Sequence, residues 1–230
     1  MNSNIYFNEN ISAKTRTSVV KILRTVETQI AQFFTLNTSL YDFYIRMAPD
    51  VKTISPQMNS VAEAYESGVI FIDLKSENFN ENELAVLAFH ELNHIKFFAK
   101  NPQSFRLFNY MTTEGIAKVF ENEVVEKFNY QIPDYMQAAP LSRAKLLSGL
   151  RDIIEITEKD ENWDKDLWFY NFADKKDSPQ NFGYKIGEFL VEEFRKKDNV
   201  PMKKLVELSY EDFWKFAKDL LRNEDEECEN

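Results

Sequence analysis

The fold is decided by residues 84–98, LAVLAFHELNHIKFF, and the candidate chemistry lies inside the same stretch. Apolar side chains fill most of its positions, so the sequence predicts a helix that is buried nearly all round. Asn80 is a good N-cap for this helix, and Glu83 stands where a carboxylate can complete a capping box. Asn101 and Pro102 should end it, because the residue before a proline avoids helical backbone angles. We therefore expect one buried helix between Asn80 and Asn101.

Hydrophobic periodicity predicts the elements around this helix. Residues 12–34 repeat apolar side chains every three or four positions, which indicates an amphipathic helix. Residues 41–47 alternate between apolar and polar side chains, and residues 69–74 are apolar on nearly both faces, so both indicate strands. The fold class is therefore predicted as α+β, with a small mixed sheet, a pair of helices that carry the candidate site, and a helical C-terminal part. Further helices are expected over residues 113–128, 141–156, 183–196 and 211–221.

The length of 230 residues suits one compact unit with a subdomain. Pro133 and Pro140 interrupt the pattern of helices and mark a soft boundary. On that basis residues 1–130 form an N-terminal α+β part, residues 131–222 form a helical C-terminal part that completes a cleft, and residues 223–230 form an acidic tail.

Composition narrows the function. Hydrophobic residues at 43%, including 20 Phe, supply a large core, and only five Gly argue against a loop-rich sandwich. The net charge of −10 disfavours nucleic acid and anionic membranes as partners, because both attract clustered Lys and Arg. The single cysteine, Cys228, forms no internal disulfide, and neither a signal peptide nor a membrane span is evident. We therefore expect a cytoplasmic location.

The motif His90-Glu91-Leu92-Asn93-His94 contains both histidines of the chain. Side chains four residues apart project from one helix face, so the two imidazoles can bind one metal ion. Glu91 lies to the side, where it can reach a metal-bound water without binding the metal itself. Satisfied core histidines are the alternative, but each polar group buried without a partner costs on the order of a few kcal/mol. We interpret the motif as a zinc site in which Glu91 is the general base.

A catalytic zinc ion usually has three protein ligands and one open position. Because the chain has no third histidine, the third ligand must be Asp or Glu, and Glu114 is the best candidate. Gly115 beside it suggests that another backbone approaches closely. Glu121 falls on the same helix face two turns later, where it could orient a ligand imidazole. The alternatives are a Glu114 that complements a helix dipole near the helix start, and a Glu121 that is solvated or structural.

These residues resemble a known group of enzymes. His90 to His94 matches the HExxH of zinc metallopeptidases, and the nineteen residues between His94 and Glu114 match the spacing of thermolysin-like gluzincins. Glu114-Gly115-Ile116-Ala117 is similar to the third-ligand helix of the aminopeptidase N family. Over about residues 68–195 the layout is similar to small predicted zinc-dependent proteases of bacteria. The resemblance implies a zincin-like fold, one Zn²⁺ per chain and a peptide or protein substrate.

A candidate oxyanion donor lies further along the chain. Gly183-Tyr184-Lys185-Ile186-Gly187 resembles the Tyr-x-x-Gly element of the aminopeptidase N family, whose tyrosine stabilises the transition state. Peptide hydrolysis needs such a donor, and both histidines are already used on the metal. Tyr184 lies between two glycines at a predicted helix start, which helps to present the ring, although a core tyrosine is the alternative. The Gly-x-Met-x-Asn element that holds a free amino terminus is missing, which argues against exopeptidase activity, and so is the transition-state histidine of thermolysin.

Metal-assisted amide hydrolysis is the function that these residues predict. Zinc lowers the pKa of a bound water to ~7, Glu91 takes the proton, and Tyr184 stabilises the oxyanion. Residues 69–74 are expected to form the cleft edge and to pair with an extended peptide. The rival hypothesis is a degenerate peptidase fold that binds a peptide or protein without cleaving it. A retired site tends to lose its base or a ligand, and both are present here, so the peptidase is favoured.

Overall fold

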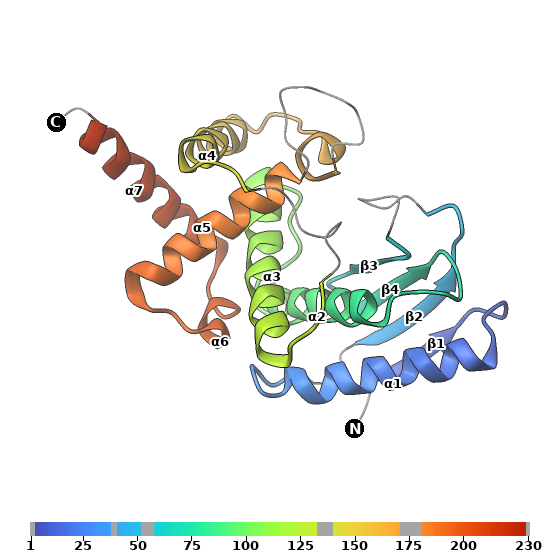
Figure 1. Ribbon diagram of the computed structural model, residues 1–230. Helices are drawn as coiled ribbons and strands as arrows, with labels where there is room; N and C mark the ends of the chain where they lie inside the picture. Colours follow the sequence, from blue (N-terminus) through green and yellow to red (C-terminus); the bar gives the residue numbers. More distant parts are fainter. Residues whose placement is uncertain (1–2, 38–40, 52–57, 133–139, 171–180, 229–230) are drawn as a thin grey trace. The chain divides into compact units, whose positions relative to one another are not determined.

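A computed structural model describes residues 3–37, 41–51, 58–132, 140–170 and 181–228. Its mixture of helices and strands confirms the α+β class (Figure 1). Packing divides the chain into two compact units, Met1–Gln103 with Phe120–Gln137, and Ser104–Val119 with Ala138–Asn230. This division falls inside helix α3 (Leu107–Phe128), whereas the sequence places a boundary after residue 130. Pro133, one of the two prolines that mark that boundary, lies outside the described residues.

A four-stranded mixed sheet forms the base of the first unit. It has the order β1-β2-β4-β3, in which β3 runs antiparallel to β4 and the other neighbours are parallel. The strands are β1 (Asn4–Phe7), β2 (Asp42–Met47), β3 (Ser60–Ala64) and β4 (Val69–Leu74). β2 and β4 confirm the two predicted strands, while β1 and β3 were not predicted. β4 lies between β2 and β3, so the expectation that residues 69–74 form an open edge is wrong, and β3 is the edge strand on that side.

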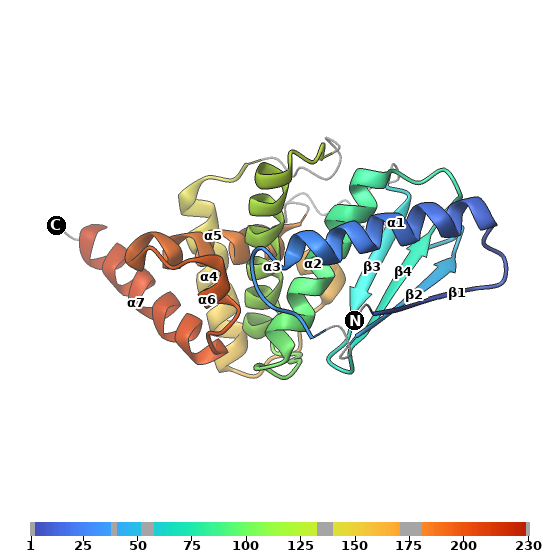
Figure 2. The ribbon, with the colours of Figure 1, turned by 90° about the horizontal axis from the view of Figure 1, so that it is seen from below.

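One face of the sheet is buried and the other is partly exposed. Helices α1 (Ala13–Ile30) and α2 (Glu81–Phe98) contact each other and lie against the buried face (Figure 2). On the other face Tyr6 stacks on Tyr44 with ring centroids 4.8 Å apart. The alternation of burial along β2 and β4 is the period of two expected for a sheet covered on one side. The buried side chains include Phe43, Ile45, Ile70 and Ile72.

The N-cap predicted for α2 is confirmed. The Asn80 side chain accepts hydrogen bonds from the backbone N–H groups of Asn82 at 2.9 Å and Glu83 at 3.2 Å. The Glu83 carboxylate is fully buried and accepts hydrogen bonds from the Ser60 N–H at 2.7 Å and the Asn59 N–H at 3.0 Å. Glu83 therefore joins the first turn of α2 to the start of the edge strand β3.

Helix α3 begins earlier than predicted. It starts at Leu107 instead of near residue 113, because Thr112 and Thr113 are accommodated inside the helix. Their hydroxyl groups donate hydrogen bonds at 2.9 Å to the carbonyls of Phe108 and Asn109, four residues back. Glu114 is consequently an interior residue of α3, and its placement near a helix start is wrong.

The described residues of the second unit form helices. Three of its helices confirm predicted segments: α4 (Arg143–Glu158), α5 (Phe182–Asp198) and α7 (Tyr210–Cys228). A π-helical turn, η3 (Asp166–Tyr170), and the short helix α6 (Met202–Leu205) were not predicted.

The acidic C-terminal segment is helical through Cys228, although the sequence suggested a tail after residue 222. Arg143 binds Glu224 through two nitrogen atoms at 3.2 and 2.5 Å. Two nitrogen atoms of Arg151 donate to the two carboxylate oxygens of Asp225, at 3.0 and 2.5 Å. These pairs attach the last turns of α7 to α4. The last two residues of the expected tail lie outside the described residues.

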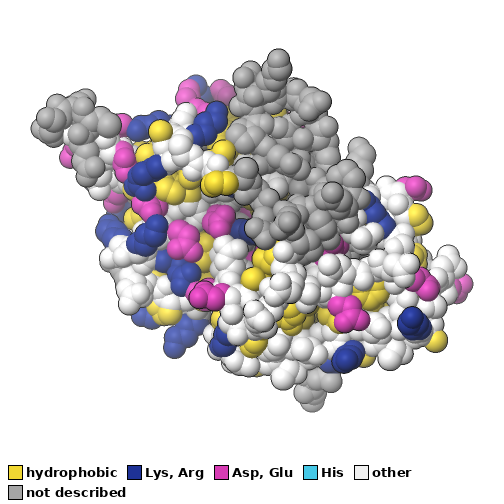
Figure 3. All heavy atoms as spheres, viewed as in Figure 1, with side chains coloured by type: hydrophobic (Ala, Val, Ile, Leu, Met, Phe, Trp, Pro, Cys, Tyr) yellow, Lys and Arg dark blue, Asp and Glu magenta, His cyan; other side chains and the backbone are white. Residues whose placement is uncertain are grey.

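The surface carries charges of both signs. Lys and Arg side chains are interspersed with Asp and Glu over the described part of the face in Figure 3. Within the described ranges no helix combines the length and the apolar character needed to cross a membrane.

Close approach of two helix backbones at Gly115, which the sequence suggested, is confirmed inside the second unit. A Cβ atom built on Gly115 would lie 2.3 Å from the backbone of Gly187 on α5. A Cβ atom on Gly187 would lie 2.3 Å from the Met111 carbonyl oxygen of α3. Neither position has room for a side chain, so α3 and α5 cross with their backbones in contact.

We expect Gly115→Ala to destabilise the protein. Alanine stabilises an unobstructed helix by about 1 kcal/mol relative to glycine. Here the added methyl group must push two backbones apart, and overpacking of this kind costs about 1–3 kcal/mol or more. Thermal unfolding followed by circular dichroism measures whether the melting temperature falls or rises. Ser148→Ala, at an exposed position of α4, is the control and should change little. A Gly115→Ala variant more stable than wild type would contradict the close crossing.

Candidate metal centre

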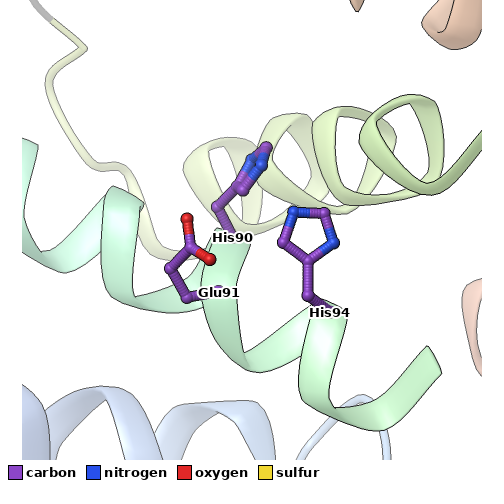
Figure 4. A group of neighbouring side chains, drawn as sticks. All are labelled: His90, Glu91 and His94. Carbon is purple, nitrogen blue, oxygen red and sulfur yellow. The ribbon is translucent and has the colours of Figure 1, made fainter. Parts of the chain in front are cut away.

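Helix α2 brings His90, Glu91 and His94 together. One ligand atom from each residue lies within 4.8 Å of the others. The two imidazoles project from the same side of the helix and Glu91 lies beside them (Figure 4). The three residues are buried, with exposed fractions of 9%, 5% and 5%. The spacing predicted from the helical repeat therefore brings together, inside the first unit, three side chains that could hold a metal ion.

Ring contacts restrict both imidazoles. The His90 and His94 rings meet edge to face, with centroids 4.7 Å apart and planes at 85°. His94 also stacks on Phe98, one helical turn later, with centroids 5.7 Å apart and planes at 15°. Because each ring is packed against another, neither can turn freely about its side-chain bonds.

Glu121 contacts one of the two imidazoles. Its Oε2 atom lies 3.3 Å from Nδ1 of His90, and both side chains are buried. A carboxylate at Nδ1 favours the tautomer that carries its proton there, which leaves Nε2 as the atom available to a metal. The contact is one that would let Glu121 orient the His90 imidazole, and that role stays a prediction.

Aromatic packing holds the segment of α3 that carries Glu121. The neighbouring Phe120 ring meets Phe33 edge to face at 5.0 Å and Phe89 at 6.2 Å. Phe89 in turn stacks on Phe128 at 6.1 Å with planes at 13°. Phe89 directly precedes His90, just as Phe120 directly precedes Glu121, so the rings pack beside the polar pair and keep it in an apolar surrounding.

Glu114 belongs to the second unit. It is 7% exposed and lies two helical turns before Glu121 on the same face of α3. It is not a member of the group formed by His90, Glu91 and His94. Its assignment as the third ligand stays a prediction.

Tyr184 also belongs to the second unit, in the first turn of α5. Its ring meets Phe169 edge to face at 5.3 Å. It precedes Gly187 by one helical turn, so it is placed near the crossing at which α5 contacts Gly115. Burial lowers the pKa of the neighbouring Lys185 ammonium. The role of Tyr184 as oxyanion donor stays a prediction.

One polar residue of the motif was overlooked in the sequence. Asn93 is fully buried, and neither its amide nitrogen nor its amide oxygen has a hydrogen-bond partner within the described part of the chain. A buried polar group left without a partner costs about 1–3 kcal/mol. The sequence offers one signal for it: Asn93 is an amide in an almost wholly apolar helix, and it has no assigned role as a metal ligand.

The side chains fit a zinc ion. Zinc binds histidine nitrogen at about 2.0–2.1 Å, so two ligands of a tetrahedral site lie about 3.4 Å apart. Ligand atoms already within 4.8 Å of one another need only small adjustments to reach that separation. The two imidazoles supply the nitrogen donors that zinc prefers, and Glu121 gives His90 the carboxylate partner typical of zinc-binding histidines.

Comparison with known proteins agrees with this site. Residues 16–215 match the model of a family described as predicted Zn-dependent protease (DUF2268). A search of curated proteins finds no match. The matched segment covers most of the chain and includes every residue of the candidate site, so the chain belongs to the DUF2268 family of predicted Zn-dependent proteases.

Proposed function

We propose that this protein is a zinc-dependent peptidase of the gluzincin type, which hydrolyses peptide bonds with water. The observation that carries the proposal is the buried group of His90, Glu91 and His94, with Glu121 on the Nδ1 atom of His90. Membership of a family of predicted Zn-dependent proteases supports it. The mixed sheet followed by the helices α2 and α3 also suits the zincin-like fold that the motif implies.

His90 and His94 are proposed to hold one Zn²⁺ per chain, with Glu114 as the third protein ligand. The support for Glu114 is its burial, its spacing from His94 and its position on the same face of α3 as Glu121. A carboxylate buried inside a helix, away from either terminus, gains little from the helix dipole, which weakens the structural alternative.

Glu91 is proposed to be the general base. A zinc ion held by His90 and His94 would supply Lewis-acid chemistry, polarising the substrate carbonyl and lowering the pKa of a bound water to about 7. The Glu91 carboxylate then accepts a proton from the attacking water and passes it to the amine nitrogen of the leaving group. Its position beside the two histidines on α2 suits that transfer (Figure 4).

Tyr184 is proposed to donate its hydroxyl proton in a hydrogen bond to the oxyanion. The contact between Gly115 and Gly187 supports this role, because it packs the α5 segment that begins with Tyr184 against the α3 segment that contains Glu114. A donor that is held in place before the reaction stabilises a developing charge without the cost of reorganisation that water would have.

The outer edge of β3, which no strand among the described residues covers, is proposed to bind the substrate as an extended chain. Asn59 and Tyr65, at the two ends of β3, use their backbone groups on the β4 side. By the alternation of a strand, Ser60, Ala62 and Ala64 therefore point their backbone groups away from β4. Glu83 already binds the Ser60 N–H and Ala64 is buried, so among the described residues the outward backbone groups of Ala62 are those proposed to bind a peptide or protein substrate.

The rival hypothesis remains a peptidase fold that binds a peptide without cleaving it. The presence of Glu91 beside both histidines, with Glu121 on His90, favours the enzyme. A protein that only binds peptides has no need for a base next to a metal site.

The first test of the proposal is metal content. Protein purified without a histidine tag should contain one zinc ion per chain by elemental analysis, and His90→Ala and His94→Ala should lose it, because each removes a nitrogen ligand. Glu126→Ala, an exposed carboxylate of α3, is the control and should keep the metal. Folded wild-type protein that neither contains zinc nor takes it up would exclude the proposed site.

A second test separates ligand from base. Glu91→Gln should keep zinc and lose turnover, because a base moves a proton but does not hold the ion. Glu114→Ala should bind zinc more weakly, because it removes a ligand. Metal content and cleavage of a substrate found in a peptide library are measured on both variants. If Glu91→Gln loses the metal while Glu114→Ala retains it, the two roles are reversed.

A third test concerns Tyr184→Phe, which removes one hydroxyl group. Zinc content and folding should be unchanged, and kcat should fall by about 10²–10³ with little change in KM, because the oxyanion exists only in the transition state. Tyr44→Phe, on the partly exposed face of the sheet, serves as the matched control. A Tyr184→Phe enzyme with the wild-type kcat would make Tyr184 a packing residue.

A further inference from the structure

Asn93 is the polar residue of α2 that the proposed mechanism does not use. Its side chain is fully buried between the two metal-binding histidines in the sequence, and its amide atoms find no partner among the described residues. Burial strips the Asn93 amide of its hydration, and no protein group among those described replaces the lost hydrogen bonds. An apolar side chain of similar size would not carry this cost. The amide therefore needs a reason other than packing.

Helix geometry gives the direction in which Asn93 projects. Successive residues of an α-helix are rotated by about 100°, so Asn93 projects between the directions of Phe89 and His90, one turn further along α2. Phe89 contacts Phe120 at 6.2 Å, and His90 contacts Glu121 at 3.3 Å. Phe89 and His90, whose side chains project on either side of Asn93, thus contact the neighbouring residues Phe120 and Glu121 of α3. Asn93 accordingly faces the part of α3 that carries Glu121.

We infer that Asn93 is a positioning residue for the pair formed by His90 and Glu121, and that its amide holds a buried water molecule shared with the Glu121 carboxylate. A buried water needs two to four polar partners. The amide offers both a donor and an acceptor, and a carboxylate accepts several hydrogen bonds. This inference rests on the proposed zinc site.

The consequence for the metal site is indirect. The shared water restrains the Glu121 carboxylate, and Glu121 restrains the imidazole of His90 through Nδ1. The Nε2 atom of His90 is then held in the orientation that zinc requires. Loss of a residue that orients a metal ligand typically weakens metal binding by about 10–100-fold. Asn93 touches neither metal nor substrate in this scheme.

Asn93→Leu tests the inference with measurements that do not depend on peptidase activity. The melting temperature of the metal-free variant should stay close to that of the wild type, because an apolar side chain of similar size replaces the buried amide together with its water. Its Kd for Zn²⁺, measured by competition with a chelator, should rise by about 10-fold. The visible absorption of the Co²⁺-substituted variant should shift, because the His90 ligand is less well oriented. Asn93→Ser keeps a hydroxyl for the water and should bind zinc nearly as well as the wild type.

A double-mutant cycle with Glu121→Gln separates positioning from packing. If Asn93 acts through Glu121, the combined variant should lose little more zinc affinity than Glu121→Gln alone. Additive losses would overturn the inference, and so would an Asn93→Leu variant with unchanged Kd and Co²⁺ spectrum. A wild type that binds no zinc would overturn the proposed function as well, and it would be recognised before any Asn93 variant is compared. If Asn93→Leu does not fold, Asn93→Ser decides the question: weak zinc binding by the folded Asn93→Ser variant would also overturn the inference.

Discussion

A helix that is apolar on every side must be enclosed by other elements, and α2 places this demand on the first unit. The helix lies against the sheet and α1, and aromatic side chains of α3 pack on Phe89. Into this apolar surrounding the chain places His90, Glu91 and His94. Ionisable groups are stable in such a place only with partners or a metal. The same helix therefore needs both apolar neighbours on every side and polar partners for these three side chains. The position of Glu121 on His90 meets part of that demand.

The same dependence reaches the edge of the sheet. Glu83 is buried at the start of α2 and binds backbone N–H groups of Asn59 and Ser60. An edge strand exposes unpaired backbone groups. The Glu83 carboxylate binds those at the start of β3, and it thereby fixes the strand to the helix that carries the site. The rest of β3 is therefore held in a constant relation to α2 within the first unit.

Much of this could be predicted from the sequence, because α2 and its motif depend on local rules. Helical spacing alone places His90 and His94 on one side, and the Asn80 cap follows from residue type. The two strands that were missed depend on distant partners. β1 has four residues and pairs with β2 about 38 positions away, and β3 contains two alanines, which have little strand preference of their own. The order of the strands was equally out of reach, since it arises from pairing and not from periodicity. The roles of Glu114 and Tyr184 depend on packing between distant segments, which a pattern does not specify.

The packing of the two imidazoles has a spectroscopic consequence. The chain contains two histidines, and their rings lie edge to face, with His94 also stacked on Phe98. Each ring therefore lies in the ring-current field of another ring, and their magnetic resonance signals should be well separated. No other imidazole contributes to that region of the spectrum. The protonation, tautomer and ligation state of the centre can thus be followed in the whole protein through the chemical shifts of four nitrogen atoms.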